Sequence, residues 1–268
     1  MMHCLEAVIF DWAGTTVDHG SLAPVRAITE LFHRQGIFLS DADARKDMGI
    51  FKRDHIRNVL AMPHVSRQWR ELKGSAPSEQ DVHHLFAFFL PLQMSILEEY
   101  SQVIPGVPAI ADQLRSRGLR IGGTTGYTRP MLDVLLKQAA AQGYHTDHAL
   151  CPDDTFGGRP HPWMCLQLAI HFRLSATWTA VKIGDTVSDI DEALNAGMWA
   201  VGVAATGNEI GLSESDLAAL PHDERGSRIE SARRRLMTAG AHYVIDRAAD
   251  SEAVLNEIDS RLAAGDRP

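Results

Sequence analysis

Acidic residues stand directly after two apolar runs of the chain, at points where buried strands would end. Asp11 follows the run AVIF, and Asp185 follows TAVKIG, with Asp189 four residues later. Oxygen ligands of this kind suit Mg²⁺, and a carboxylate held beside Mg²⁺ can attack phosphorus as a nucleophile. These residues therefore predict a Mg²⁺ site in which one of the carboxylates could form an aspartyl-phosphate.

Two further segments supply groups that suit a phosphoryl ligand. Thr125 and Gly126 follow the apolar run LRIGGT, and Arg159 precedes a predicted helix in GGRPHP. A hydroxyl and a guanidinium can bind phosphoryl oxygens and offset their negative charge. Helix capping would explain Thr125 or Asp185 taken singly, but it does not explain the carboxylates together with Arg159.

Strand and helix patterns alternate over most of the chain and would position these groups. The predicted strands are 7–10, 119–124, 148–151, 179–184, 199–203 and 242–246, and the predicted helices are 107–117, 129–143, 162–172, 188–197 and 250–263. This alternation predicts an α/β fold with a Rossmann-like parallel sheet and helices on both faces. Ligands then bind at the carboxyl ends of the strands.

One long segment interrupts the alternation and has helical patterns almost throughout. We expect residues 20–103 to form a helical cap domain, inserted into an α/β core domain made of residues 1–19 and 104–268. Pro91 is expected to kink or split the long helix of this cap. The aromatic residues within 86–89 are expected to pack inside it.

Composition limits the kind of partner. The chain has 268 residues, 45% of them hydrophobic, a formal net charge of −8 and a pI of about 5.9, which argues against nucleic-acid and membrane-surface partners. The arginine-rich stretch 225–235 is interleaved with glutamates and is interpreted as an exposed helix face. We expect a cytoplasmic protein, because the three cysteines form no CxxC pair and neither a secretory signal nor a membrane span is evident.

Four motifs taken together resemble those of the haloacid dehalogenase superfamily. They are DWAGT (11–15), TTG (124–126), RPHP (159–162) and GDTVSD (184–189). The helical segment between the first two matches the cap domain of that superfamily, and the motifs span nearly the whole chain. The resemblance implies Mg²⁺ as cofactor and an aspartate nucleophile.

Ala13 stands where phosphatases of this superfamily carry a second aspartate, which protonates the leaving alcohol. The side chain of Ala13 cannot donate a proton, although its backbone carbonyl can still bind Mg²⁺. A leaving group bonded to phosphorus through carbon needs an electron sink instead, and a lysine imine supplies one. The chain has lysines at 46, 52, 73, 137 and 182, and residue type alone does not choose among them.

Five motifs are similar to the phosphonatase family (phosphonoacetaldehyde hydrolases) within that superfamily. They are DWAGTTVD (11–18), MGIFKRDH (48–55), TTGYTR (124–129), GRPHPWM (158–164) and GDTVSD (184–189). This resemblance implies hydrolysis of the carbon–phosphorus bond of phosphonoacetaldehyde to acetaldehyde and phosphate. It implies a Schiff base on Lys52 and an aspartyl-phosphate on Asp11.

The resemblance also implies roles for the other matched residues. The implied metal ligands are Asp11, the backbone of Ala13, Asp185 and, directly or through water, Asp189. Thr125 and Arg159 fall on the phosphate-binding positions. We expect Met48, Gly126 and Tyr127 to lie near the substrate. His55 could carry protons, and the alternative is that it is an ordinary packed histidine. The family commonly forms homodimers through cap helices, so a homodimer is expected here.

Two departures from the family pattern and three rival functions stay open. Ser21 stands where members often carry cysteine, and His19 where tyrosine is common; both lie near the predicted hinge. The rivals are a phosphomonoesterase or mutase of the same superfamily, a catalytically silent binding protein, and a dehalogenase. Ala13 argues against the first, and the retained reactive residues argue against the second. A dehalogenase would have no use for Asp185 and Asp189.

Overall fold

The computed structural model describes residues 4–268, and its strands form a six-stranded sheet in the order β3-β2-β1-β4-β5-β6. The strands are β1 (Ala7–Phe10), β2 (Arg120–Thr124), β3 (His148–Leu150), β4 (Ala180–Gly184), β5 (Trp199–Val203) and β6 (Tyr243–Ile245). All neighbouring strands run parallel. The predicted α/β fold with a parallel sheet is confirmed.

The pairing register brings the ends of three strands to one edge of the sheet. Phe10 at the end of β1 pairs with Gly123 of β2 and with Ile183 of β4. The residues that follow these strands therefore leave the sheet side by side. β1, β4 and β5 are buried along their whole length, as expected for a parallel sheet that is covered on both faces.

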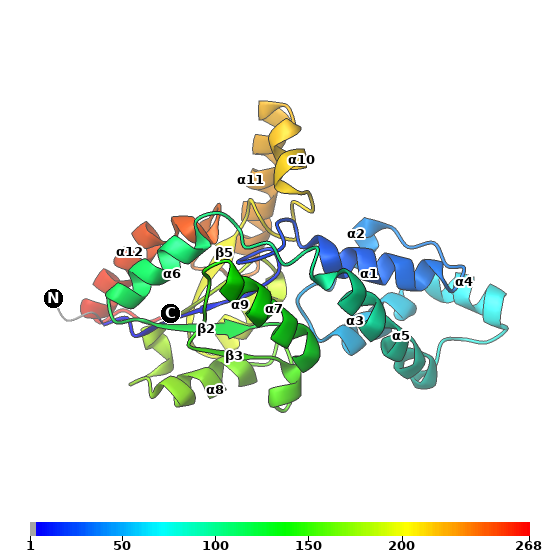
Figure 1. Cartoon of the computed structure of the whole chain (residues 1–268), viewed down its shortest axis with the longest axis horizontal. Coiled ribbons are helices and arrows are strands. Elements are labelled where there is room, and N and C mark those ends of the chain that lie inside the picture. The colour runs from blue at the N-terminus through cyan, green and yellow to red at the C-terminus, as the bar shows by residue number, and fades with distance from the viewer. Residues whose placement is uncertain (1–3) are drawn as a thin grey trace.

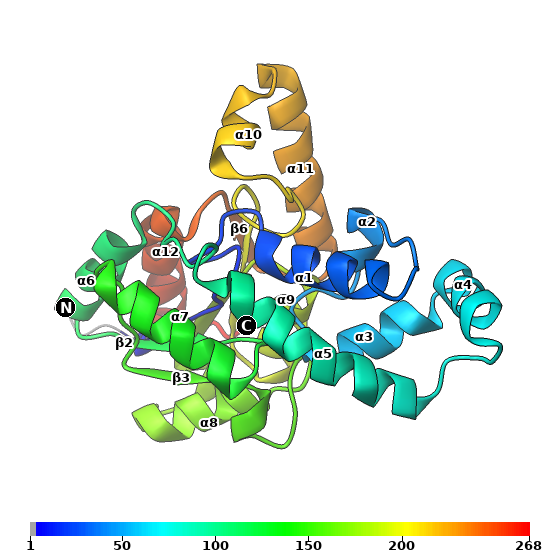
Figure 2. The same ribbon diagram turned by 45° about the vertical axis from the view of Figure 1, so that its right-hand side comes forward.

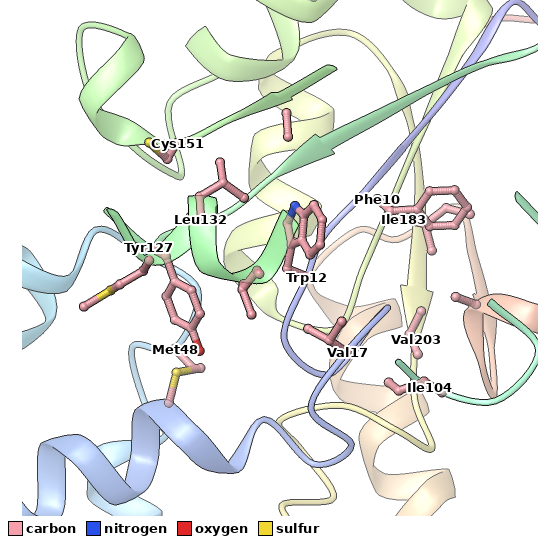
Figure 3. Packing of buried hydrophobic residues seen from close by; sticks show 14 of the residues in the cluster. Phe10, Trp12, Val17, Met48, Ile104, Tyr127, Leu132, Cys151, Ile183 and Val203 are labelled. Carbon is pink, nitrogen blue, oxygen red and sulfur yellow. The ribbon is translucent and has the colours of Figure 1, made fainter. Parts of the chain in front are cut away.

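Helices cover both faces of the sheet. They include α6 (Val107–Ser116), α7 (Arg129–Ala141), α8 (Trp163–Phe172), α9 (Val187–Asn195) and α12 (Glu252–Ala263). Val8 and Phe10 pack in one cluster with α6, α7 and α12, part of which Figure 3 shows. Ala7 and Ile9 pack with α8 in another cluster, because alternate residues of a strand point to opposite faces. Short 3₁₀ helices lie at Pro152–Asp154, Thr177–Thr179 and Ala248–Asp250.

Five helices between β1 and α6 form the cap, a separate body beside the sheet (Figures 1 and 2). They are α1 (Leu22–His33), α2 (Asp41–Ala44), α3 (Lys52–Ala61), α4 (Pro63–Lys73) and α5 (Glu79–Leu97). The chain leaves and re-enters the core through adjacent segments, since Val17 pairs with Val103 and the Asp18 amide donates to the Gln102 carbonyl at 3.1 Å. The two crossings between sheet body and cap therefore lie side by side.

The structure corrects part of two expectations about the long cap helix. α5 continues through Pro91 to Leu97, so the helix is not split there. Pro91 is exposed, while the opposite face of α5 packs against α1 and α3, which hold the helix together. Phe89 is buried as expected and Phe86 half-buried, but Phe88 is 52% exposed, because successive residues of a helix cannot face the same side.

Helices α10 (Glu214–Ala219) and α11 (His222–Thr238) project from the sheet body (Figures 1 and 2). α10 was not predicted. α11 contains the arginine-rich stretch 225–235, whose arginines are exposed or half-exposed, which confirms the interpretation as an exposed helix face. Within residues 4–268, every helix is too short or too polar to cross a membrane.

Candidate active site

Five of the predicted site residues meet at the carboxyl edge of the sheet. Asp11 and Asp185 follow β1 and β4 directly, and Thr125 follows β2. Asp189 lies in the first turn of α9, and Arg159 lies in the loop before α8. All five are at most 5% exposed. The fold thus brings together the groups that the sequence placed at separate strand ends.

Three of these residues form a compact group of carboxylates. One oxygen each of Asp11, Asp185 and Asp189 lies within 4.8 Å of the others. Burial and the neighbouring Asp189 raise the pKa of Asp11, although Arg159 opposes them. Burial and the other two carboxylates raise the pKa of Asp185 well above its usual value. Burial alone would raise the pKa of Asp189, but the cations Arg159 and Lys182 outweigh it and lower that pKa. A further cation would let all three ionise.

Arg159 contacts three carboxylates at once. Its Nη2 lies 2.8 Å from Asp11 Oδ1, and its Nη1 lies 3.0 Å from Asp189 Oδ1. Its Nε donates to Glu192 Oε2 at 2.9 Å. Nη2 also donates to the backbone carbonyl and the hydroxyl of Thr124, at 2.7 and 2.8 Å. The planar guanidinium is therefore held in one orientation beside the nucleophile candidate.

Glu192 and Lys182 complete a buried charge cluster. Lys182 Nζ lies 2.7 Å from Asp189 Oδ1 and 3.8 Å from Glu192 Oε2. The cluster contains the carboxylates of Asp11, Asp185, Asp189 and Glu192 and the cationic side chains of Arg159 and Lys182. One divalent cation would balance the remaining negative charge, and carboxylate oxygens suit such an ion. The residues present therefore fit a divalent metal.

Lys52 comes from the cap and is 2% exposed. It is the first residue of α3, and its Nζ lies 3.5 Å from Met48 Sδ and 5.6 Å from the centre of the Tyr127 ring. Burial lowers the pKa of Lys52 to about 7, and Asp11 only partly opposes this effect. The positive end of the helix dipole disfavours the ammonium further. A substantial fraction of the amine is therefore neutral at neutral pH.

His55 and Tyr127 lie near the lysine and stay uncharged. Burial, followed by the charge of Lys52, lowers the pKa of His55 to about 3, so its imidazole is neutral. Burial raises the pKa of the Tyr127 hydroxyl well above its ordinary value, so it stays protonated. Both side chains are almost completely buried. They can exchange or hold a proton but add no net charge to the site.

A short cap segment lies directly on the core backbone. A Cβ on Gly126 would lie 2.5 Å from the carbonyl oxygens of Gly49 and Ile50. A Cβ on Gly49, whose φ is 92°, would lie 2.3 Å from Ser188 Oγ, and that hydroxyl donates to the Met48 carbonyl at 3.0 Å. The close approach of cap and core therefore requires glycine on both sides.

The cavity between cap and core has a volume of only about 20 Å³, room for about one water molecule. The predicted site residues that line it are Asp11, Ala13, Met48, Lys52, Thr125, Gly126, Tyr127 and Arg159. Asp185, Asp189 and His55 stand behind this lining. Ser21 also lines the cavity, whereas the Nδ1 of His19 lies 2.9 Å from the Leu212 carbonyl. The structure therefore shows a closed cap.

Sequence reasoning missed several residues of the site. Glu192 follows Asp189 by three positions on one helix face, and Lys182 interrupts an apolar strand; both are signals that could have been used. Thr15 Oγ1 donates a hydrogen bond to Asp185 Oδ1 at 3.1 Å, and the backbone amide of Asn208 donates to Asp185 Oδ2 at 2.7 Å. The Asn208 contact comes from the backbone, so its residue type carried no signal.

The comparisons with known proteins agree with this geometry. The family model described as haloacid dehalogenase-like hydrolase matches residues 5–197. The phosphonoacetaldehyde hydrolase of Nitratidesulfovibrio vulgaris is 43% identical over 264 residues, covering 98% of this chain and 94% of the relative. That of a Bacillus cereus strain is 42% identical over 257 residues, covering 96% and 97%. The chain belongs to the phosphonoacetaldehyde hydrolase family.

A solved structure supports the same conclusion. The crystal structure of a phosphonoacetaldehyde hydrolase like protein from Oleispira antarctica superposes on this enzyme with a TM-score of 0.97 at 42% identity. The match covers 100% of this chain and 98% of the other. The enzyme is thus a hydrolase of the haloacid dehalogenase superfamily, as the motifs predicted. Hydrolases of this superfamily generally use a divalent metal, which the carboxylate group described above fits.

A divalent cation is expected to stabilise the fold. With Mg²⁺ or Mn²⁺ at about 100 times its Kd, the free energy of unfolding should rise by about 2.7 kcal/mol. Asp185→Asn should lose most of this gain, whereas Asp191→Asn, a half-buried acid of the same loop–helix segment, should keep it. Differential scanning calorimetry with and without the ion measures both. An equal gain in the two variants would place the ion elsewhere.

Proposed function

We propose that the enzyme hydrolyses the carbon–phosphorus bond of phosphonoacetaldehyde to acetaldehyde and phosphate. The observation that carries the proposal is the buried amine of Lys52, with a pKa of about 7, in one cavity with the Asp11 carboxylate. A neutral amine can attack the aldehyde carbon, and a carboxylate can attack phosphorus. The names of the two relatives and of the solved structure support the same substrate.

Lys52 would act first, on the aldehyde. Its neutral amine adds to the carbonyl carbon, and uptake of one proton with loss of water leaves an iminium beside the carbon that bears phosphorus. This iminium is an electron sink, so the leaving carbon needs no proton at the moment of bond cleavage. Ala13 is consistent with this step, because a general acid at that position would have no task.

Asp11 would then attack phosphorus. A bond forms between an Asp11 carboxylate oxygen and phosphorus while the carbon–phosphorus bond breaks, and its electron pair converts the iminium into an enamine. Arg159 orients the carboxylate and, together with Thr125, would bind the phosphoryl oxygens. Protonation and hydrolysis of the enamine release acetaldehyde and restore Lys52. Water then hydrolyses the aspartyl-phosphate to phosphate and restores Asp11.

We propose Mg²⁺ as the divalent ion of this site. Asp11, Asp185 and the backbone carbonyl of Ala13 would hold it, with Asp189 as a ligand directly or through water. Two cations already contact Oδ1 of Asp189, which favours the indirect role. When bound, Mg²⁺ offsets the negative charge that the nucleophile and the phosphoryl group bring together.

The remaining cavity residues would shape the site around the aldehyde. The thioether of Met48 and the ring of Tyr127 lie against the Lys52 amine and take the place of water around it. The neutral imidazole of His55 would carry protons during imine formation and hydrolysis. Gly126 lets the cap backbone approach closely enough to exclude water.

Substrate entry requires the cap to open, because a cavity of about 20 Å³ cannot hold phosphonoacetaldehyde. We assign the cap to residues 20–103 and the core to residues 1–19 and 104–268. The hinge would lie where Val17 pairs with Val103. Closure then brings Lys52 to the carboxylates of the core.

Hydrolysis or transfer of a phosphate ester is the main alternative, and the site argues against it. An ester needs a general acid for the leaving alcohol. Among the described residues that line the cavity, Asp11 is the only carboxylic acid, and it serves as the nucleophile. The enzyme therefore favours a substrate whose leaving group is activated by the amine.

We propose that the enzyme works in the cytoplasm as a homodimer formed through the cap. Its three cysteines are free, and Cys151 and Cys165 are buried, which suits a reducing compartment. The cap exposes Phe38, Leu72 and Phe88, which are 76%, 53% and 52% exposed. Light scattering should give twice the chain mass of 29.5 kDa. A monomer mass at micromolar concentration would overturn the dimer.

Removal of the Lys52 amine should abolish carbon–phosphorus cleavage. Lys52→Met keeps the length and apolar contacts of the side chain but cannot form an imine, so acetaldehyde release should fall at least about 1,000-fold. Lys46→Met, an exposed lysine of the same cap segment, is the matched control and should keep full activity. Borohydride added with phosphonoacetaldehyde should link the substrate carbons to Lys52 in the unaltered enzyme. Near-normal turnover by Lys52→Met would refute the imine.

The pH profile of kcat/KM should fall on its acid side from a point near neutral pH. Lys52 attacks only as the neutral amine, so kcat/KM should fall about tenfold per pH unit below a pKa of about 7 and level off above it. A bound divalent cation moves this limb further toward acid, because it repels the ammonium. The measurement is kcat/KM for acetaldehyde release in assays that run from about pH 5 to about pH 10. A limb near pH 10 would show an ordinary, solvated lysine.

A further inference from the structure

One cap residue, Arg45, contacts the cap, the hinge and the core at the same time. It follows α2, and its Nη1 donates to the Gly20 carbonyl in the hinge at 2.9 Å. The same nitrogen donates to Oδ1 and to the carbonyl of Asn208, at 3.1 and 3.3 Å, in the core loop between β5 and α10. Asn208 Nδ2 donates in return to the Arg45 carbonyl at 3.3 Å. Arg45 and Asn208 are thus joined in both directions.

The core loop is shaped to receive this guanidinium. Gly211, with a φ of +63°, lies so close that a Cβ there would be 2.7 Å from Arg45 Nε. The Gly211 carbonyl accepts a further hydrogen bond from Nη2 at 3.4 Å. Arg45 is half-buried in this place, and Asn208 is only 4% exposed. The contact is therefore packed as well as hydrogen-bonded.

Asn208 continues the contact to the reactive carboxylates. Its backbone amide donates to Asp185 Oδ2 at 2.7 Å, and the neighbouring Gly207 packs so tightly that a Cβ there would lie 2.4 Å from Asp185 Cβ. The other oxygen of Asp185 accepts from Thr15. The position of the 206–212 loop therefore decides how one of the two oxygens of Asp185 is held.

We propose that Arg45 and Asn208 form a latch that couples closure of the cap to the orientation of Asp185. Arg45 belongs to the cap, so opening of the cap withdraws its guanidinium from the Asn208 side chain and from the Gly211 carbonyl. Asn208 then loses the contacts that hold its amide against Asp185. Both latch residues are positioning residues, and the proposal rests on the proposed metal role of Asp185.

An adjacent ion pair offers a matched control. Arg235 on α11 lies 3.3 Å from Glu209, the residue after Asn208, with its Nη1 facing Glu209 Oε2. Arg235 is 52% exposed, and no hydrogen bond among the described residues joins it to the hinge or to Asp185. Arg235→Gln therefore removes a guanidinium from the same neighbourhood without removing a hydrogen bond of Arg45 or Asn208.

The first experiment measures closure without using activity. An amine-acetylating reagent is added to the metal-free protein, and the modification rate of each lysine is followed by peptide mass spectrometry. In Arg45→Gln, Lys52 should be modified roughly fivefold to tenfold faster, because the cap opens more often. Lys182, buried in the core, and the exposed Lys46 should keep their rates, and Arg235→Gln should behave as the unaltered protein. An unchanged Lys52 rate would overturn the closing function of the latch.

The second experiment measures the coupling to Asp185 through the Kd for Mn²⁺, determined by titration calorimetry. Arg45→Gln and Asn208→Ala should each weaken binding roughly fivefold to tenfold, and the double variant should bind no more weakly than the weaker single one. Arg45→Lys, a milder change that keeps the charge, should give an intermediate value, and Arg235→Gln should bind normally. Circular dichroism checks that each variant is folded.

Two results would overturn the coupling, and they differ from a failure of the proposed function. Unchanged Mn²⁺ affinity in both single variants, or losses that multiply in the double variant, would show that the two residues act apart from Asp185 or from each other. Absence of Mn²⁺ binding by the unaltered protein would overturn the proposed metal site itself. The rate at which Lys52 is modified still tests closure in that case.

Discussion

The buried guanidinium of Arg159 is the interaction on which the arrangement of the site depends. It contacts Asp11, which follows β1, and Asp189 and Glu192 of α9. Without this cation the carboxylates would repel one another in a place where water cannot screen them. Because Arg159 lies in the loop before α8, it also ties that loop to the strand ends. Positive charge at one point thus holds together segments that lie far apart in the sequence.

The charge cluster and the neutral lysine are consequences of the same burial. Exclusion of water raises the pKa of Asp11 and Asp185 and lowers the pKa of Lys52 to about 7. Both effects depend on the cap, because Lys52 comes from α3 and the cavity is only about 20 Å³. The close backbone contact at Gly126 makes that burial possible. An open cap would expose these groups and return them toward ordinary acid–base behaviour.

The two bodies of the enzyme contribute different halves of the proposed chemistry. The edge of the sheet supplies a carboxylate, a guanidinium and a metal-binding group, which together suit phosphoryl transfer in general. The cap supplies an amine, which suits a carbonyl next to the phosphorus-bearing carbon. Ala13 removes the general acid that an ester would need. Under the proposed mechanism, selectivity for a phosphonoaldehyde would arise because a substrate must satisfy both halves at once.

The sequence by itself determined the alternation of strands and helices, the inserted helical segment and the strand ends that carry Asp11 and Asp185, because these features follow from local periodicity. Tertiary structure decided what depends on contacts between distant segments. It joined Glu192 to Arg159, linked Arg45 of the cap to Asn208 of the core, and kept α5 continuous through Pro91. It also lowered the pKa of the Lys52 amine, since burial is a property of the assembled fold and not of a residue type.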